Sequence, residues 1–312
     1  MTFNHNWQIG LATHTGPVKQ RNEDNYFLKM TTDPKGHEFG LLAIADGMGG
    51  YKAGAEASKL VVLLLDEWWQ KRVPKLIKKK NLQQLLSVEF EKLFTKMNEE
   101  LLKVGTKLGT TLSLVVMHAG HYQLYHVGDS RIYQIKGSQG FQRFIHQQQV
   151  NGHDLTPQDT EELEGEMEMA LLTEDHSWVE QQVKKGKLTR EQARNHQKRN
   201  MLTQCLGIEE GVDPFEQVGF YHSSDLFLLC SDGFYSMFSD EEIIRTLQGL
   251  EKEYTDLQMI ADYLVKLANF SGTRDNITVL LVRNVFAKDQ VAATDHKNMW
   301  KSLLSKYKRG TD

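Results

Sequence analysis

Acidic residues that could ligate a metal ion recur along this chain at the ends of apolar runs. Four aspartates, Asp46, Asp129, Asp232 and Asp275, each flank such a run beside a glycine or a small polar residue. A short apolar run that stops at Asp-Gly is typical of a buried strand followed by a tight turn, so we expect these carboxylates at strand ends. One such aspartate would most often be an ordinary turn residue. Four of them, together with Glu23-Asp24 at the foot of an early strand, indicate a shared site.

The chemistry of such a site follows from its charge. Carboxylates gathered without matching Lys or Arg repel one another, and a hard divalent cation that accepts oxygen ligands relieves the repulsion. We therefore expect Mg²⁺ or Mn²⁺. Zinc is disfavoured, because neither a Cys-x-x-Cys nor a His-Glu-x-x-His spacing occurs in the sequence.

Length and composition favour one large domain. The chain has 312 residues, of which 40% are hydrophobic, and a site built from positions 23 to 275 requires nearly all of it to fold together. The net charge of −4 gives no general attraction for nucleic acid or for an anionic membrane. Met1–His5 lack the basic and apolar regions of a leader, so we expect a cytoplasmic protein. We expect no membrane partner, and we expect a monomer. Cys205 and Cys230 lie in apolar contexts typical of buried thiols.

The hydrophobic pattern predicts antiparallel sheets with helices outside them. The predicted strands are Trp7–Thr13, Asn25–Met30, Glu38–Ala45, Thr111–His118, Tyr122–His126, Arg131–Ile135, Phe215–Phe220, Asp225–Leu229 and Ile277–Val282. The predicted helices are Ala53–Gln70, Leu82–Val104, Glu241–Gln248 and Asp256–Asn269. Ser239 with Glu242, and Thr255 with Gln258, have the spacing of capping boxes at the starts of the last two helices.

Three charged segments leave alternatives open. A basic run around Pro74, from Lys71 to Lys80, is interpreted as a solvated loop between helices or, less often, a docking patch. Asp154 to Glu168 carries seven acidic residues and no Lys or Arg, which is typical of a surface insertion. The tail from Asp295 to Asp312 has apolar residues at helical spacing among basic ones, and either packs on the domain or binds a partner.

Six short motifs, read together, resemble a known family. They are Asn22-Glu23-Asp24, Asp46-Gly47-Met48-Gly49-Gly50, Gly109-Thr110-Thr111, Gly128-Asp129-Ser130-Arg131, Ser231-Asp232-Gly233 and Asp275-Asn276. Their order and spacing resemble the bacterial branch of the metal-dependent type-2C protein serine/threonine phosphatases over roughly residues 7–284. The segment from Leu172 to Gly207, with a Thr189–Gln192 capping box, is similar to the flap of that family.

The resemblance implies a fold and a division of the chain. The fold is an α+β, four-layer α-β-β-α sandwich of two antiparallel sheets flanked by helices, with a helical flap subdomain. The catalytic domain would span residues 1–286, with an acidic insertion and the flap at 136–207. A basic C-terminal tail, residues 287–312, would follow it.

The resemblance also implies roles for the acidic residues. Asp46 would bridge two metal ions with help from the Gly47 carbonyl, and Asp232 and Asp275 would complete the first ion. Glu23 and Asp24 would hold metal-bound waters, and Asp129 with Asp232 would bind a third ion. Two divalent ions bridged by one carboxylate lower the pKa of a shared water, so that hydroxide attacks the phosphate directly and no nucleophilic Cys or Ser is needed.

The chain departs from the family pattern at two positions. Lys19 stands where an arginine fork usually grips the phosphate, and Arg21 follows two residues later. We expect Lys19 to contact phosphate and Arg21 to be a weaker candidate. Tyr51 stands where bacterial members often have histidine, so His14, Tyr51 or a metal-bound water could each act as general acid. His176 in the flap is interpreted as a local hydrogen-bonding residue.

These residues predict a phosphatase that acts on phosphoserine and phosphothreonine in proteins, opposing a partner serine/threonine kinase. The alternative is a catalytically weak phosphoprotein-binding regulatory module of the same fold, which Lys19 and the insertion favour but the complete set of aspartates disfavours. A two-metal nuclease would need a basic cleft, which the acidic insertion disfavours.

Overall fold

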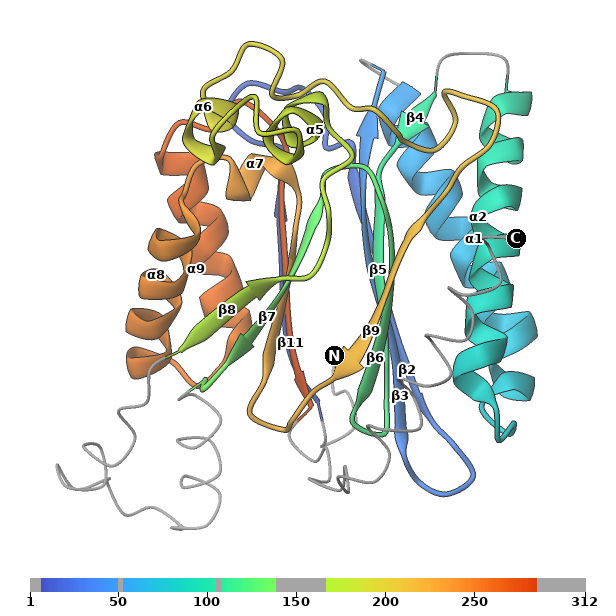
Figure 1. Ribbon diagram of the computed structural model, residues 1–312. Helices are drawn as coiled ribbons and strands as arrows, with labels where there is room; N and C mark the ends of the chain where they lie inside the picture. Colours follow the sequence, from blue (N-terminus) through green and yellow to red (C-terminus); the bar gives the residue numbers. More distant parts are fainter. Residues whose placement is uncertain (1–6, 50–52, 105–107, 139–166, 285–312) are drawn as a thin grey trace, which may run out of the picture.

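Two antiparallel sheets face each other in the computed structural model, which describes residues 7–49, 53–104, 108–138 and 167–284 (Figure 1). The first sheet has the order β1 (Trp7–His14), β11 (Ile277–Asn284), β10 (Leu226–Cys230), β7 (Arg131–Lys136) and β8 (Glu168–Leu171). The second has the order β2 (Asp24–Thr32), β3 (Glu38–Met48), β5 (Leu112–His118), β6 (His121–Val127) and β9 (Phe215–Phe220), and β4 (Gly109–Thr110) pairs with β3. The predicted antiparallel pairing is confirmed.

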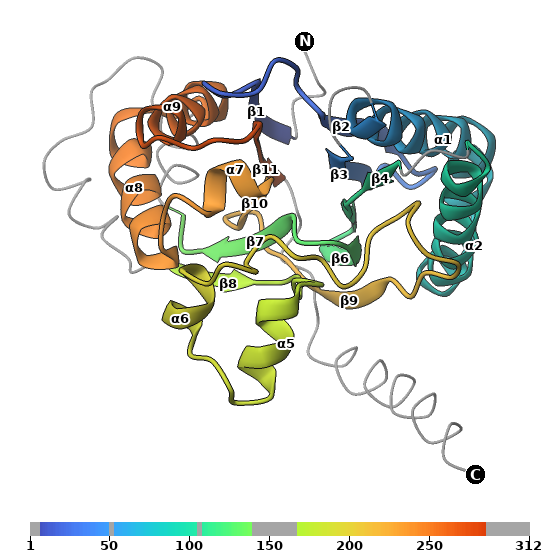
Figure 2. The same cartoon turned by 90° about the horizontal axis from the view of Figure 1, so that it is seen from above.

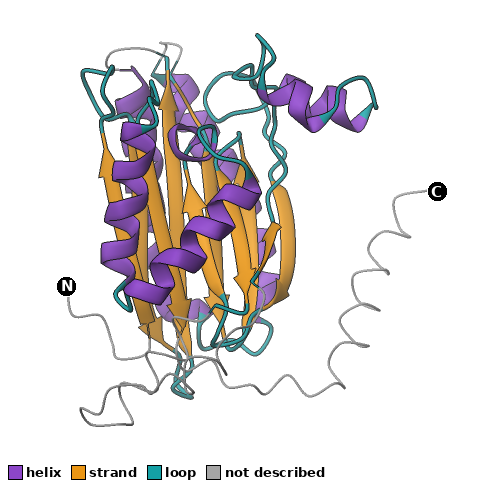
Figure 3. Ribbon diagram, turned by 90° about the vertical axis from the view of Figure 1, so that its left-hand side faces the viewer, coloured by secondary structure: helices purple, strands orange, loops and turns teal. Residues whose placement is uncertain are grey.

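Helices cover the outer face of each sheet. α1 (Ala53–Leu76) and α2 (Leu82–Lys103) lie against the second sheet, and α8 (Asp240–Glu253) and α9 (Leu257–Phe270) against the first, which gives the predicted four layers (Figure 2). Two short helices, α5 (Trp178–Lys184) and α6 (Arg190–Arg194), stand out from the sandwich (Figure 3). They form the helical flap. None of the described helices is both long and apolar enough to cross a bilayer.

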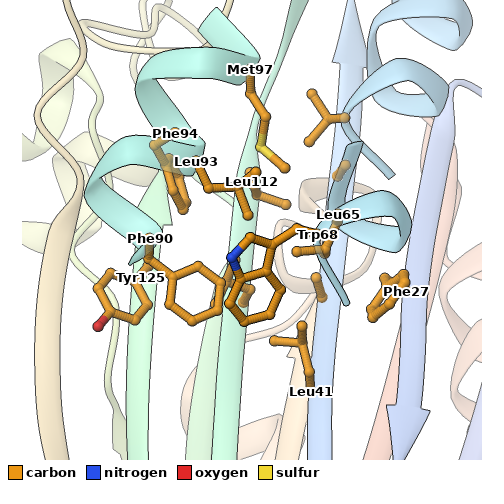
Figure 4. Close-up of a cluster of buried hydrophobic side chains, with 14 of the residues drawn as sticks. Phe27, Leu41, Leu65, Trp68, Phe90, Leu93, Phe94, Met97, Leu112 and Tyr125 are labelled. Carbon is orange, nitrogen blue, oxygen red and sulfur yellow. The ribbon is translucent and has the colours of Figure 1, made fainter. Parts of the chain in front are cut away.

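Each central strand is buried on both faces because its side chains alternate between two cores. In β3, Leu41 and Ala43 pack toward α1 and α2, whereas Leu42 and Ile44 face the core between the sheets. The outer core includes rings from both helices and the sheet (Figure 4), and the Phe90 ring centroid lies 4.8 Å from that of Trp68 and 4.6 Å from that of Tyr125. This packing explains why the sequence shows continuous apolar runs at the central strands.

The structure corrects two local predictions. The basic run is not an interhelix loop at Lys71, Arg72 and Lys75, because α1 continues through Pro74 to Leu76. A proline this close to a helix end removes a single backbone hydrogen bond, and Arg72 binds Glu89 of α2 through its guanidinium.

At the start of α9, the N-cap is Asp256 rather than Thr255, and the Asp256 side chain accepts the Gln258 N–H at 2.9 Å. The Gln258 amide instead pairs with the Leu11 backbone of β1, donating to its carbonyl at 2.8 Å. The predicted boxes at Ser239 and Thr189 are both confirmed. The acidic stretch up to Glu166 and the tail from residue 285 lie outside the described residues.

Candidate active site

One end of the sandwich gathers the acidic residues. Asp24, the first residue of β2, lies directly opposite Asp46 in the β2–β3 pairing. Asp46 lies inside β3 rather than after it, and Thr111 fixes its backbone: the Asp46 N–H donates to Thr111 Oγ1 at 2.9 Å, and the Asp46 carbonyl accepts from the Thr111 N–H at 2.8 Å. Asp129 follows β6, Asp232 begins the short helix α7 (Asp232–Tyr235), and Asp275 precedes β11. We call Glu23 and these five aspartates the acidic cluster.

Hydroxyl and amide side chains join the two sheets at the acidic cluster. Asp24 Oδ2 accepts hydrogen bonds from Ser231 Oγ at 2.8 Å and Thr278 Oγ1 at 2.7 Å. Ser231 directly follows β10, and Thr278 lies in β11 of the first sheet. Asn276 Oδ1 accepts the Glu23 N–H at 2.9 Å, and its amide donates to the Arg21 carbonyl at 2.9 Å. Sequence reasoning assigned no role to these three side chains. For two of them the sequence does contain a signal: Ser231 and Asn276 are each next to a predicted metal ligand along the chain.

Two glycines allow the chain to close around Glu23. A Cβ atom on Gly47 would lie 2.1 Å from the Gly54 carbonyl oxygen, and one on Gly54 would lie 2.8 Å from Glu23 Oε1. The Gly47 N–H donates to the Glu23 carbonyl at 3.2 Å. Glycine is required here because the first turn of α1 packs backbone to backbone against the end of β3.

The acidic cluster is strongly perturbed electrostatically. Burial and the charges of Asp24 and Asp232 raise the pKa of Asp46 well above its usual range, and burial and the charge of Asp129 do the same for the pKa of Asp232. Burial raises the pKa of Asp24 to about 6 and, together with the charge of Asp175, that of Asp129 to about 7. The carboxylates are therefore close enough to oppose one another's ionisation, as expected for a site that needs added positive charge.

Unpartnered oxygens test whether cations would fit. Among the described residues, Glu23 Oε1, Asp24 Oδ1 and Asp232 Oδ1 are buried without a hydrogen-bond partner. A buried carboxylate oxygen left unpaired is costly, and hard divalent cations bind this type of ligand. The cluster therefore fits Mg²⁺ or Mn²⁺ in its chemistry. No three of its carboxylates have ligand atoms all within 4.8 Å of one another. Among the described residues, the group that meets this criterion is Asp33, His37 and His118, which lie outside the acidic cluster.

Lys19 lies beside the acidic cluster. Its Nζ is 2.8 Å from Asp275 Oδ1 and 3.6 Å from Glu23 Oε2. Partial burial lowers the pKa of Lys19, but the hydrogen bond to Asp275 and the nearby carboxylates outweigh it and raise the pKa. Arg21 is exposed, and its backbone rather than its side chain makes the contact to Asn276. His14 accepts the Gly16 N–H at 2.9 Å, whereas Tyr51 lies outside the described residues.

The flap joins the sandwich next to Asp129. His176 makes local contacts. Its backbone N–H donates to the Gly128 carbonyl at 2.7 Å, and its ring Nδ1 lies 3.0 Å from Gln204 Nε2. Arg131 binds Asp175 through Nη2 at 2.7 Å, and its guanidinium lies 3.9 Å from the centre of the Tyr235 ring. The base of the flap is thus connected to β7, which follows Asp129, and through Arg131 to α7, which begins at Asp232.

Neither cysteine has the setting of a nucleophile. Cys230 is buried in β10 and Cys205 is partly buried, and both thiols are free. Burial raises the pKa of Cys205 to about 11 and that of Cys230 further, so both stay protonated at neutral pH. A thiolate nucleophile is therefore disfavoured at both cysteines.

Known proteins share this sequence and architecture. A family model described as protein phosphatase 2C matches residues 17–267. The serine/threonine phosphatase stp of Listeria innocua is 31% identical over 291 residues, which cover 90% of this chain and 98% of the relative. A solved serine/threonine phosphatase of S. agalactiae is 30% identical, with a TM-score of 0.69 over 89% of this chain and 99% of that one. The catalytic domain of the phosphatase PstP, solved in complex with two manganese ions, is 25% identical, with a TM-score of 0.64 over 89% of this chain and 98% of its own. Since the family model spans most of the described sandwich, the chain belongs to the protein phosphatase 2C family.

Proposed function

We propose that this protein hydrolyses phosphoserine and phosphothreonine in protein substrates, using two divalent cations held by the acidic cluster. The observation that carries the proposal is the convergence of carboxylates from both sheets, several with unpartnered buried oxygens, in a chain of this family. Bound Mn²⁺ or Mg²⁺ would activate water for attack on phosphorus and neutralise charge on the phosphoryl group.

Each member of the cluster has an assigned part. Asp46 would bridge the two ions beside the Gly47 carbonyl, and Asp232 and Asp275 would complete one of them. Glu23 and Asp24 would orient metal-bound waters, and Asp129, whose charge acts on Asp232, would hold a third ion. Ser231, Thr278 and Asn276 position these carboxylates through the hydrogen bonds described above.

The substrate would enter between the flap and the sandwich. A pocket of about 580 Å³ there is lined by Asp129 and Asp232 and also by Arg190, Arg194 and Arg199. Such a mixture of carboxylates and guanidinium groups suits a phosphorylated segment, because the arginines can pair with its phosphate or with acidic neighbours. A cytoplasmic location, a monomeric state and an opposing serine/threonine kinase remain predictions.

Lys19→Ala should raise KM for a phosphothreonine peptide about tenfold, the loss expected for one charged hydrogen bond. Lys19 Nζ contacts Asp275, and a cation on Asp275 would compete for that carboxylate and leave the ammonium to the phosphate. Steady-state kinetics at saturating Mn²⁺ would measure the change. Lys59→Ala, on the exposed face of α1, serves as the control. An unchanged KM in Lys19→Ala would remove Lys19 from the substrate site.

The affinity for Mn²⁺ should increase as the pH rises from about 5 to about 8. The pKa values of Asp24 and Asp129, raised to about 6 and about 7, mean that protons occupy these carboxylates in the lower part of this range. A cation binds the ionised form, so each displaced proton should change the dissociation constant about tenfold per pH unit below the raised pKa. Calorimetric titration at several pH values measures this. A dissociation constant that stays constant across the range would contradict the assignment.

The experiment that tests the proposed function is hydrolysis of a phosphothreonine peptide and of p-nitrophenyl phosphate by chelator-treated protein, with and without Mn²⁺. We expect turnover with Mn²⁺ and none in Asp232→Asn. A phosphoprotein-binding module would instead retain the peptide without releasing phosphate, and that result would favour the alternative function.

A further inference from the structure

A second group of metal-binding side chains lies at the opposite end of the second sheet. Asp33 follows β2 in the hairpin that leads to β3, His37 closes this hairpin, and His118 ends β5. The hairpin lies at the far end of β2 and β3 from α7 (Figure 1). Asp24 and Asp33 are separated by an extended strand that advances about 3.3 Å per residue, so the two sites lie roughly 30 Å apart. This group therefore cannot share ions with the acidic cluster.

The three side chains converge on one carboxylate oxygen. Asp33 Oδ2 lies 3.0 Å from His37 Nδ1 and 3.1 Å from His118 Nε2. The other oxygen, Oδ1, accepts the backbone N–H groups of Lys35 at 2.7 Å and His37 at 2.9 Å. The turn thus orients the carboxylate and leaves Oδ2 as the atom that both imidazoles approach.

We propose that Asp33, His37 and His118 bind a transition-metal ion of the Zn²⁺ class. Each of these side chains offers one ligand atom, and the three atoms all lie within 4.8 Å of one another. In the described part of the chain, this is the group of His, Cys, Asp or Glu side chains that meets that criterion. Tetrahedral zinc with bonds of about 2.0–2.1 Å places its ligand atoms about 3.3 Å apart, so a small opening of the two short contacts would admit the ion. Water would supply the fourth ligand from the side of His37, because that side chain is 40% exposed to solvent.

The ligand chemistry separates this site from the acidic cluster. Two imidazoles and one carboxylate suit Zn²⁺, whereas an all-oxygen set suits Mg²⁺ or Mn²⁺. Burial lowers the pKa of His118, which keeps its imidazole in the neutral form that metals bind. The rings are also supported: His118 packs 5.9 Å from the Phe39 ring and meets His37 edge to face at 5.9 Å. The hydrogen bonds to Asp33 Oδ1 act as the outer partners that hold a ligating carboxylate in place.

The competing explanation is a pair of hydrogen bonds that merely fasten the hairpin to β5. His118→Gln distinguishes the two, because an amide can still donate to Asp33 but cannot replace an imidazole ligand. His37→Gln, at the more exposed position, provides a second variant if His118→Gln fails to fold. His121→Gln is a matched control, since His121 pairs with His118 across β5 and β6 while its Nδ1 lies 3.0 Å from the Ala119 carbonyl.

The experiment titrates the full chain with Zn²⁺ against a chromogenic chelator, with Mg²⁺ present in excess to occupy the acidic cluster. We expect one zinc ion whose affinity is the same in wild type, His121→Gln and Asp232→Asn. It should fall at least about tenfold in His118→Gln and His37→Gln, since loss of an outer partner alone costs about that much. Cobalt(II) bound to the wild type should show the intense visible absorption of a tetrahedral site, and this should be absent from His118→Gln. Equal zinc affinity in wild type and His118→Gln, or loss of this zinc in Asp232→Asn, would overturn the proposal.

Discussion

Asp46→Asn should lower kcat for a phosphothreonine peptide by at least about a hundredfold and, in the metal-free protein, raise the melting temperature. Loss of a side chain that only orients a metal ligand costs about 10- to 100-fold, so loss of the carboxylate that we propose bridges the two ions should cost at least as much. The stability gain follows from charge. Burial, followed by the charges of Asp24, Asp232, Asp129 and Asp275, raises the pKa of Asp46. A neutral amide removes both the cost of burying a charge and the repulsion.

The opposite signs of these two effects make the test specific. A variant that merely damaged the fold would lose activity and melting temperature together. Asp262→Asn, on the exposed face of α9, should change neither quantity. Kinetics at saturating Mn²⁺ and thermal unfolding in chelator give both values. Near wild-type activity in Asp46→Asn would show that Asp46 does not ligate the catalytic ions.

Arg283→Met should destabilise the protein by about 3–5 kcal/mol, the usual cost of breaking a buried ion pair on one side. The Arg283 side chain is 0% exposed and binds the Glu251 carboxylate and the Ser138 hydroxyl, and Ser138 Oγ in turn donates to Glu251 at 2.6 Å. Methionine fills similar volume but removes the Arg283 guanidinium from the buried Glu251 carboxylate. For a domain of this size the loss corresponds to a fall in melting temperature of roughly 10 °C.

A double variant separates charge from packing in this pair. Arg283→Met combined with Glu251→Leu should recover most of the lost stability, because well-packed apolar residues can replace a buried ion pair at little cost. Both variants should retain Mn²⁺-dependent activity at low temperature, since α8 and the outer end of β11 are remote from Asp275. A double variant as unstable as Arg283→Met alone would show that packing, and not the loss of the guanidinium charge beside Glu251, causes the loss.

The sequence predicted the sandwich because its strands and helices have strong local signals. Continuous apolar runs such as Leu41–Ala45 indicate buried strands, and the capping box at Ser239 indicates the start of α8. Elements whose stability depends on distant contacts were not predicted. β8 (Glu168–Leu171) is short and pairs with β7 at the edge of the first sheet, and α7 is a single turn that begins at Asp232.

The site was predicted in its acidic residues but not in the groups that hold them. An aspartate at the end of an apolar run is visible in the sequence, whereas the bonds from Ser231 and Thr278 to Asp24 join residues more than 200 positions apart. The same limit applies to Asp33, His37 and His118, since His118 lies 85 residues from Asp33 along the chain. No local pattern connects such residues, and the pairing of β3 with β5 is what brings them together.

Diffraction from a Mn²⁺-loaded crystal at the manganese absorption edge would show whether the acidic cluster holds the ions, because anomalous density locates each ion without reference to activity. We expect two strong peaks that share the Asp46 carboxylate, with Asp232 and Asp275 coordinating one of them. Peaks that do not touch Asp46, or manganese bound elsewhere while the protein still hydrolyses phosphopeptide, would contradict this expectation.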